Sequence, residues 1–230
     1  MIILEKTETY GWEAAVRGMR NPMNSWDKTD SEWCRDAEGG NMPCVNCYYF
    51  EKGVPTCRCP KDKAVYVIGD NDLALMKKLA AAGSDHGKFL RMITVTVDIT
   101  APLYWWKEFD TYKVGTVANS CSTMHKIHAK KFTREDFSTD HLIPRMLEVL
   151  DVTIANLNAC RGNYLETQDK KWWWQMIQLL PSSYNQKRTV QMNYAVLKNL
   201  YHSRRNHKLD EWHVLCDWVE KLPYSELITN

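Results

Sequence analysis

Apolar residues recur at helical spacing along most of the chain. In residues 12–20 they share one face, and Asn21-Pro22 ends the pattern. A second helix is predicted to begin at a cap formed by Asn71 or Asp72 and to stop at Gly83. The same spacing predicts helices over residues 142–160, 170–180, 189–206 and 209–222.

Strand-forming residues are fewer. Met92 to Ile99 is rich in β-branched residues and partly alternating, which predicts a strand. The strand is expected to end where Ala101-Pro102 opens another helix. The pattern therefore predicts a helix-rich protein with a minority of strand.

Residues 23–63 differ from the rest of the chain in composition. They are polar, rich in Asp, Gly and Pro, and carry five of the eight cysteines. Such a segment has little core of its own. We therefore expect a single domain over residues 1–230, with 23–63 as a cysteine-rich insertion.

The insertion contains two close cysteine pairs, Cys44-x-x-Cys47 and Cys57-x-Cys59. Two pairs at this separation can place four thiolates around one tetrahedral ion, and thiolates favour zinc. A structural zinc would also stabilise a loop too polar to bury itself. Free thiols and disulfides are the alternatives, because Cys-x-Cys is less diagnostic than a second Cys-x-x-Cys.

Composition and charge narrow the classes of function. An apolar fraction of 44% and a charged fraction of 25% are those of a globular protein, and no run approaches the roughly 18 apolar residues of a membrane span. We expect a cytoplasmic protein without a membrane partner. The net charge of +2 argues against an extended nucleic-acid surface.

Aromatic residues gather in runs. The chain has ten tryptophans and eleven tyrosines, with Tyr104-Trp105-Trp106 and Trp172-Trp173-Trp174 as the densest groups. Large aromatic side chains bury much area, which favours a place in the core or at a subunit interface. A stacking wall for a base or a flavin is the alternative.

From Asn71 onward the order of elements resembles the flavin-dependent thymidylate synthases, which reductively methylate dUMP with a folate donor, FAD and NADPH. The resemblance includes the helix that ends at Gly83, His86 after it, the strand that ends at Ile99, and Ala101-Pro102. It implies an α+β fold, rich in helices, with a small antiparallel sheet. It also implies a homotetramer with ligands bound between subunits.

The resemblance continues downstream. Leu179-Leu180-Pro181 with Tyr184, followed by Asn193 and Arg204, is similar to the Leu-Pro segment and the next helix of that family. Eleven residues are about three helical turns, so Asn193 and Arg204 are expected on one helix face, roughly 16 Å apart. By resemblance Asn193 and His86 meet the flavin and Arg204 meets the nucleotide. A surface arginine on a solvated face is the alternative.

Several family positions are altered. The family has Arg-His-Arg, seven residues and then Ser, where this chain has Thr111-Tyr112-Lys113 and Cys121, or Ser122 after a one-residue slip. Its arginine ahead of Leu-Pro is absent from residues 176–178. Arginine offers a fixed fork to phosphate, so these losses should change which ligand binds.

The expected ligand site is aromatic, basic and rich in hydroxyls. That composition suits a nucleotide-like ligand, although a core helix with its cations is an alternative. The predicted lining consists of Trp105, Trp106, Lys107, Tyr112, Lys113, Ser120, Cys121, Ser122, His125, Asn193 and Arg204.

Three functions fit these observations. The first is a nucleotide-binding protein that has departed from dUMP methylation. The second is a divergent FAD-dependent pyrimidine nucleotide methyltransferase, and the third is a structural assembly protein. No Ser-His-Asp elbow, phosphate-binding Gly-rich loop or His-Glu-x-x-His motif indicates another chemistry.

Overall fold

The computed structural model describes residues 2–33 and 66–230, which form two compact units. Unit 1 comprises Met1–Glu8, Thr96–Met192 and Leu200–Leu222. Unit 2 comprises Thr9–Val95, Asn193–Asn199 and Pro223–Asn230. The expectation of one domain over residues 1–230 stays a prediction.

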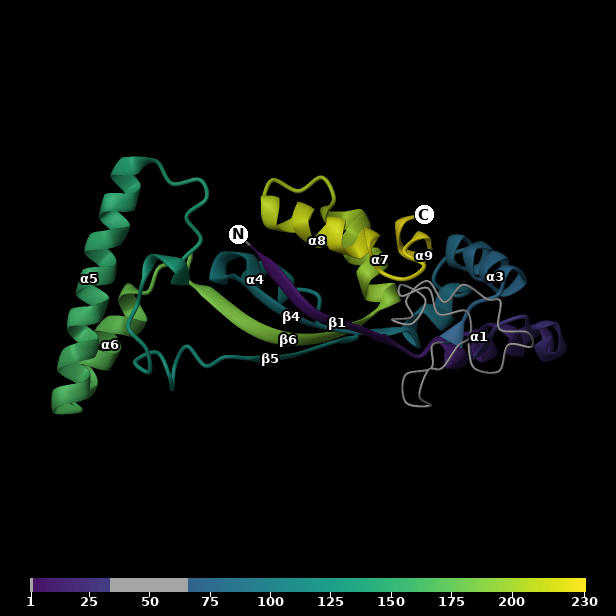
Figure 1. The fold of residues 1–230 in the computed structure, drawn as a ribbon, viewed down its shortest axis with the longest axis horizontal. Helices are drawn as coiled ribbons and strands as arrows, with labels where there is room; N and C mark the ends of the chain where they lie inside the picture. The colour runs from purple at the N-terminus through teal and green to yellow at the C-terminus, as the bar shows by residue number, and fades with distance from the viewer. Residues whose placement is uncertain (1, 34–65) are drawn as a thin grey trace, which may run out of the picture. The chain divides into compact units, whose positions relative to one another are not determined.

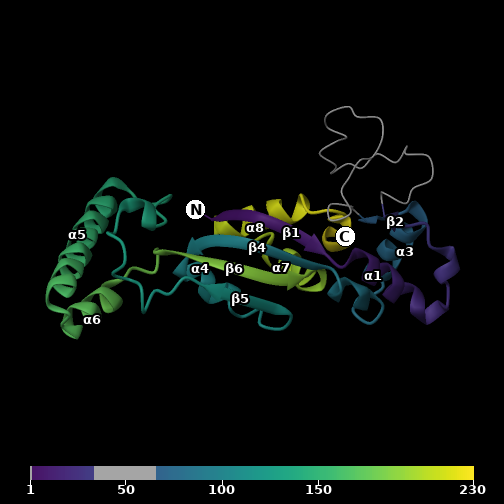
Figure 2. The ribbon, with the colours of Figure 1, turned by 60° about the horizontal axis from the view of Figure 1, so that its bottom comes forward.

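The main sheet has four antiparallel strands, shown in Figures 1 and 2. This confirms an α+β fold with a small antiparallel sheet. In the pair of β5 and β6, Thr116 lies opposite Met192 and Ser120 opposite Arg188. The strand order is β1 (Ile3–Tyr10), β4 (Thr94–Pro102), β6 (Asn185–Asn193) and β5 (Thr116–Ser120).

Alternation along β4 gives the sheet one buried side. Val95, Val97 and Ile99 are fully buried, and the two residues between them are half-buried. Two helices of unit 1, α4 (Leu103–Phe109) and α8 (Asp210–Glu220), supply the aromatic core, in which the Trp105 and Trp212 rings lie 4.8 Å apart. The Nε1 group of Trp106 donates to the Gln186 carbonyl at 3.0 Å and so attaches α4 to β6.

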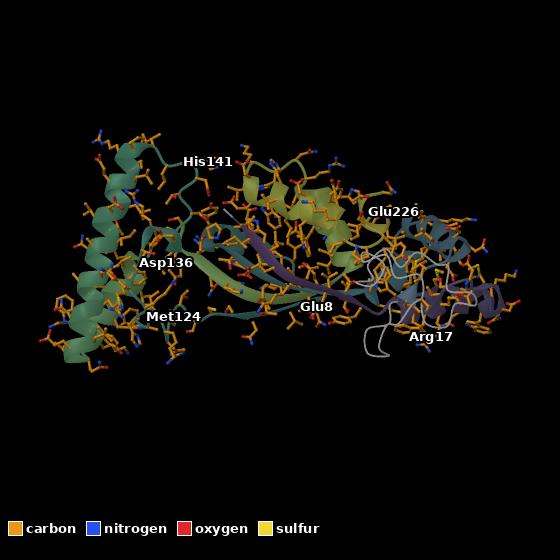
Figure 3. The ribbon with its side chains drawn as sticks, viewed as in Figure 1. Glu8, Arg17, Met124, Asp136, His141 and Glu226 are labelled. Atoms are coloured by element: carbon orange, nitrogen blue, oxygen red, sulfur yellow. The ribbon has the colours of Figure 1, made fainter. Side chains whose placement is uncertain are left out.

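A helical hairpin forms another part of unit 1. Helix α5 (Pro144–Thr167) and α6 (Lys170–Leu179) lie side by side in Figure 1. Trp173 Nε1 on α6 donates to the carbonyl of Met124 at 2.9 Å, and Figure 3 labels Met124 beside the hairpin. The hairpin core contains Ile127, Phe132, Phe137, Leu150, Ile154, Leu157 and Met176.

Unit 2 packs its helices around Trp12. The Trp12 ring meets Tyr194 edge-on at 5.2 Å and Tyr224 at 5.1 Å. The Tyr194 hydroxyl donates to the Pro223 carbonyl at 2.5 Å. The α-helices that begin in the described part of this unit are α1 (Trp12–Arg20), α3 (Asp70–Ala81), α7 (Tyr194–Arg204) and α9 (Glu226–Thr229).

A buried ion pair lies at the centre of unit 2. Asp72 is fully buried and accepts from Arg20 Nε at 2.6 Å. The same carboxylate accepts from the hydroxyls of Thr29 and Ser31, each at 2.6 Å. Arg20 is only 4% exposed, and its other nitrogens donate to the Ser25 carbonyl and hydroxyl and to the carbonyl of Lys28. A buried pair with such complete hydrogen bonding avoids the cost of an unpaired charge.

Hydrogen bonding also sets the pKa of Asp72. Burial alone would raise this pKa, but the bonds from Ser31, Thr29 and Arg20 outweigh burial, so the pKa lies below its usual 3.8. A carboxyl group with a lowered pKa stabilises the fold above its unfolded-state pKa. The stabilisation is lost as the pH falls below about 3.8 and through the folded-state pKa.

The cap of α3 differs from the prediction. The helix begins at Asp70, and Asp72 lies within it, bound to Arg20. Asp30 takes the capping role, because its carboxylate accepts from the backbone of Asn71 at 2.8 Å and of Asp72 at 3.0 Å. A side chain at Gly69 would lie 2.2 Å from the Asp30 Cγ, so this approach requires glycine.

Two short strands lie on either side of the segment that the structure does not describe. Strand β2 (Glu32–Trp33) pairs antiparallel with β3 (Tyr66–Val67), with Trp33 opposite Tyr66. The rings of Trp33 and Tyr66 meet edge-on at 5.4 Å. The predicted zinc ligands Cys44, Cys47, Cys57 and Cys59 lie outside the described residues.

Other predictions of elements hold with altered bounds. Helix α1 occupies the predicted residues, and α5 continues seven residues beyond the predicted end at residue 160. The predicted helix over residues 189–206 is wrong at its start, because Thr189–Asn193 belongs to β6. This stretch lies between two other strands, so its alternate residues are buried at a period of two. None of the described helices has the length and apolar character that a membrane crossing requires.

Asp72→Asn should lower the free energy of unfolding by about 3 kcal/mol or more, because it leaves the buried Arg20 guanidinium without its counter-charge. Urea unfolding measures this change. Asp70→Asn is the matched control, since Asp70 is exposed on the same helix, and it should cost less than about 0.5 kcal/mol. Equal losses for the two variants would contradict the central role of Asp72.

Candidate functional site

Helix α4 presents two different faces. Trp105, Trp106 and Phe109 are buried, in agreement with a core role for this aromatic run. Glu108 lies on a more open face, where its side chain is 35% exposed. The helix thus attaches to the core through its aromatic side and presents a carboxylate on the other.

Three donors converge on one oxygen of Glu108. Its Oε2 accepts from Arg204 Nη1 at 3.0 Å and from Trp212 Nε1 at 3.0 Å. His207 Nε2 lies 3.3 Å from the same atom. His207 Nδ1 accepts from the backbone of Leu209, so the neutral ring carries its proton on Nε2 and can donate it to Glu108. These partners stand about 100 residues downstream, and no local motif marks Glu108 in the sequence.

Arg204 and Tyr112 are predicted site residues that the structure brings together. Arg204 Nε donates to the Tyr112 hydroxyl at 2.8 Å. The guanidinium also lies 4.8 Å from the centre of the Trp212 ring, at cation–π distance. The side chain of Arg204 remains 20% exposed. Arg204 is therefore held in place on several sides and is still open to solvent.

A second arginine, which the sequence analysis missed, has a similar arrangement. Arg188 lies 4.1 Å from the centre of the Trp106 ring and donates to Asp110 at 2.6 Å. Its Nε donates to the side-chain oxygen of Gln186 at 3.0 Å. Trp106 is therefore a core residue whose ring is covered by an arginine of its own chain. Like Arg204 with Glu108, Arg188 with Asp110 is an arginine paired with a carboxylate of the same chain.

The predicted hydroxyl-rich segment lies at the end of β5. The backbone N–H of Cys121 donates to the Lys187 carbonyl at 2.9 Å. The carbonyl of Cys121 accepts from Gln186 Nε2 at 2.8 Å. The Ser122 hydroxyl accepts from the backbone of His125 at 2.8 Å. The exposed members of the predicted lining are Lys107, Lys113, Ser120, Cys121, Ser122 and His125.

Two predicted flavin contacts belong to unit 2. Asn193 is not on a helix face, because its Oδ1 accepts from the backbone of Val196 at 3.0 Å and so caps α7. His86 is exposed and precedes the short 3-10 helix Gly87–Arg91. Asn193 therefore does not share a helix face with Arg204, as was expected, but lies at the N-terminal cap of α7. Within residues 2–33 and 66–230 no cluster of three or more His, Cys, Asp or Glu side chains could hold a metal.

The fold matches solved structures, although no protein-family model and no curated protein matches the chain. One match is thymidylate synthase X (ThyX) from Helicobacter pylori with FAD and dUMP, with a TM-score of 0.65 and 15% identity over 99% of this chain and 95% of that one. A further structure, of flavin-dependent thymidylate synthase ThyX from H. pylori complexed with FAD and dUMP, has a TM-score of 0.62 and 15% identity over 99% and 96%.

The chain therefore has a ThyX-like fold over nearly its whole length. At 15% identity this similarity shows the fold alone. The ligand has to be inferred from the residues of the site.

The two arginines and Asn193 of the described site do not fit FAD. The pyrophosphate of FAD is anionic and requires uncommitted donors. Here Arg204 and Arg188 are each paired with a carboxylate of the same chain. The Asn193 side-chain oxygen is already used in the helix cap. We derive no step through a flavin from this set of residues.

A further contact between α4 and α8 positions Glu108 and Trp212. The Tyr104 hydroxyl donates to Glu211, a carboxylate that is 7% exposed in the first turn of α8. Burial, together with this neighbouring carboxylate, raises the pKa of Tyr104. The hydroxyl therefore stays protonated and donates at neutral pH.

Tyr104→Phe should lower the free energy of unfolding by about 1–3 kcal/mol, because it removes a donor from a buried carboxylate. Thermal and urea unfolding report this loss. Tyr201→Phe is the matched control, since the Tyr201 hydroxyl donates to the exposed Glu220 at 2.7 Å and its loss should cost less. A larger effect at Tyr201 than at Tyr104 would contradict this assignment.

Proposed function

We propose that this chain is a ThyX-like nucleotide-binding protein that has departed from dUMP methylation. The observation that carries the proposal is the environment of Arg204. The guanidinium is fixed by Tyr112, Glu108 and Trp212, while 20% of the Arg204 side chain is exposed. A fixed guanidinium beside aromatic rings suits a planar, hydrogen-bonding ligand such as a nucleotide or a molecule derived from one.

The departure from dUMP methylation is supported by charge. A nucleotide phosphate requires cationic groups that are free to pair with it. The two arginines of unit 1 described above are neutralised by Glu108 and Asp110. The ligand contacts that we propose are Trp106, Lys107, Tyr112, Lys113, Ser120, Cys121, Ser122, His125, Asn193 and Arg204, of which Trp106 would act through the arginine on its ring.

Binding between the subunits of a homotetramer is part of the proposal. Helix α5 carries exposed apolar side chains, with Met146 39%, Val149 54% and Val152 62% exposed. Apolar side chains exposed along one helix favour burial against another surface. They support self-association, and a shared ligand site would then bring together residues from neighbouring copies.

The alternative is a divergent FAD-dependent pyrimidine nucleotide methyltransferase. The extent of the fold match favours it, because the ThyX structures with FAD and dUMP align with nearly the whole chain. The two functions differ in one simple property. An enzyme of that kind binds a flavin, whereas the proposed binding protein does not require one.

Mass spectrometry of small molecules released from the purified protein tests the proposal directly. We expect a nucleotide-like compound and no flavin, because the two arginines and the Asn193 side-chain oxygen are committed within the chain. The exposed Lys107 and Lys113 are the proposed contacts for a phosphate of the nucleotide. Visible absorption of the same sample provides a second readout, since oxidised flavin is yellow. A stoichiometric flavin would contradict the proposal and favour the methyltransferase.

Arg204→Ala should weaken binding of the released ligand about tenfold to a hundredfold, which corresponds to a charge-assisted hydrogen bond of about 1.5–3 kcal/mol. Calorimetry measures this loss. Arg205→Ala is the control, because Arg205 is exposed and its guanidinium lies 5.2 Å from the Tyr201 ring instead. Equal losses at the two positions would indicate diffuse electrostatics, and no loss at Arg204 would place the site elsewhere.

A further inference from the structure

Helix α6 carries three consecutive tryptophans that cannot all face the core of the hairpin. Successive residues of a helix point about 100° apart, so Trp172, Trp173 and Trp174 lie on three different sides of α6. Trp173 packs against the hairpin core, as does Ile177 one turn further along. Trp174 lies to one side of this buried stripe, and 42% of its surface is exposed. Packing of the hairpin therefore does not account for an indole at position 174.

A lysine ammonium group lies against this exposed aromatic surface. The rings of Trp173 and Trp174 meet edge-on with their centres 4.8 Å apart. Lys170 Nζ lies 5.8 Å from the centre of the Trp174 ring and 5.9 Å from that of Trp173, at cation–π distance. The neighbouring Lys171 is paired with Asp169 at 3.1 Å, whereas no carboxylate in residues 2–33 and 66–230 is paired with Lys170. The charge of Lys170 is therefore available to an anion.

The loop that follows β5 extends the same surface. Trp173 Nε1 donates to the Met124 carbonyl at 2.9 Å, which holds this loop beside α6, where Figure 3 labels Met124. Met124 is 44% exposed, and Lys126 is exposed two residues later. Aromatic and cationic groups from two segments of unit 1 thus gather in one place. We call Met124, Lys126, Lys170, Trp173 and Trp174 the Trp174 surface.

This combination of groups matches the chemistry of single-stranded nucleic acid. Unpaired bases stack on aromatic side chains regardless of sequence, while cationic side chains pair with the phosphates between them. Trp174 offers an exposed ring to a base, and Lys170 lies beside that ring, where it can reach the adjoining phosphate. The bases of a duplex are stacked on one another, so they offer no such face to the indole.

A lipid surface matches the arrangement less well. A tryptophan that enters a membrane is accompanied by lysines whose ammonium groups point away from the apolar region. Here the Lys170 ammonium lies over the rings of Trp173 and Trp174, so insertion of the rings would carry the charge toward hydrocarbon, which is costly.

We propose that the Trp174 surface binds single-stranded nucleic acid, with a base stacked on Trp174 and a phosphate paired with Lys170. The site is local, in keeping with the net charge of +2. It shares no residue with the contacts proposed for a nucleotide-like ligand, so it does not depend on the proposed function.

Fluorescence anisotropy tests the proposal, with the full chain titrated into a labelled thymidine oligonucleotide about twelve nucleotides long. The wild type should bind this single strand at least about tenfold more tightly than a duplex of equal length, because the duplex offers no base face. Trp174→Ala should weaken binding about tenfold, and Trp174→Phe should retain most of the affinity, since it keeps an aromatic face. Lys170→Gln should weaken binding about threefold and make it less dependent on salt, because a phosphate contact is lost.

Three control variants make the result specific. Trp26→Ala removes an indole that is 51% exposed in unit 2, and Lys77→Gln removes one positive charge from the same unit. Neither should change the affinity for the oligonucleotide. Arg204→Ala should also leave it unchanged, which separates this inference from the proposed function.

Several outcomes would overturn the inference. Equal affinity for single strand and duplex would indicate a general attraction to polyanions, and an equal loss in Trp26→Ala and Trp174→Ala would remove the assignment to this surface. Loss of binding in Arg204→Ala but not in Trp174→Ala would assign the oligonucleotide to the nucleotide site instead. Sedimentation with phosphatidylserine vesicles that depends on Trp174, without oligonucleotide binding, would assign the surface to a membrane.

Discussion

The fold depends on one recurring constraint, which is that a carboxylate removed from water must be given donors. In unit 2 the fully buried Asp72 is held by Arg20 and two hydroxyls, and these bonds attach α1 to α3. In unit 1 Glu211 is held by Tyr104, and Glu108 by three donors from α7, α8 and the segment between them. Since removing one member of a buried ion pair costs several kcal/mol, the pair of Asp72 and Arg20 restricts how unit 2 can be rearranged.

The same need for charge pairing explains why the fold and the site residues lead to different conclusions about the ligand. The match to ThyX extends over nearly the whole chain at 15% identity, which shows how far side chains can change while a backbone arrangement persists. In unit 1 the arginines at positions 188 and 204 are satisfied by carboxylates of the same chain. Their charge is used in holding the structure together, which leaves less of it for an anionic ligand.

The sequence predicts elements well where a single period dominates. Helix α1 is found at the predicted residues because its apolar face is unbroken. Residues 189–193 are wrongly predicted as the start of a helix, since the burial of β6 alternates because of the strands beside it. The sequence also places Arg204 in the candidate site, but not its partner Glu108, because a pair separated by 96 residues leaves no local pattern. Arg20, the partner of Asp72, cannot be predicted for the same reason, because the two residues are 52 positions apart.

The pairing of β2 with β3 has a consequence for how this chain can vary. Trp33 and Tyr66 face each other, so the two ends of the range that the structure does not describe lie at neighbouring points of unit 2. The entropy of closing a loop rises slowly with its length, by about 0.6 kcal/mol for each doubling. An insert of almost any size can thus be accommodated between these two residues while the unit that carries it stays unchanged. A change in the length of the connection between Trp33 and Tyr66 should therefore alter the stability of this chain very little.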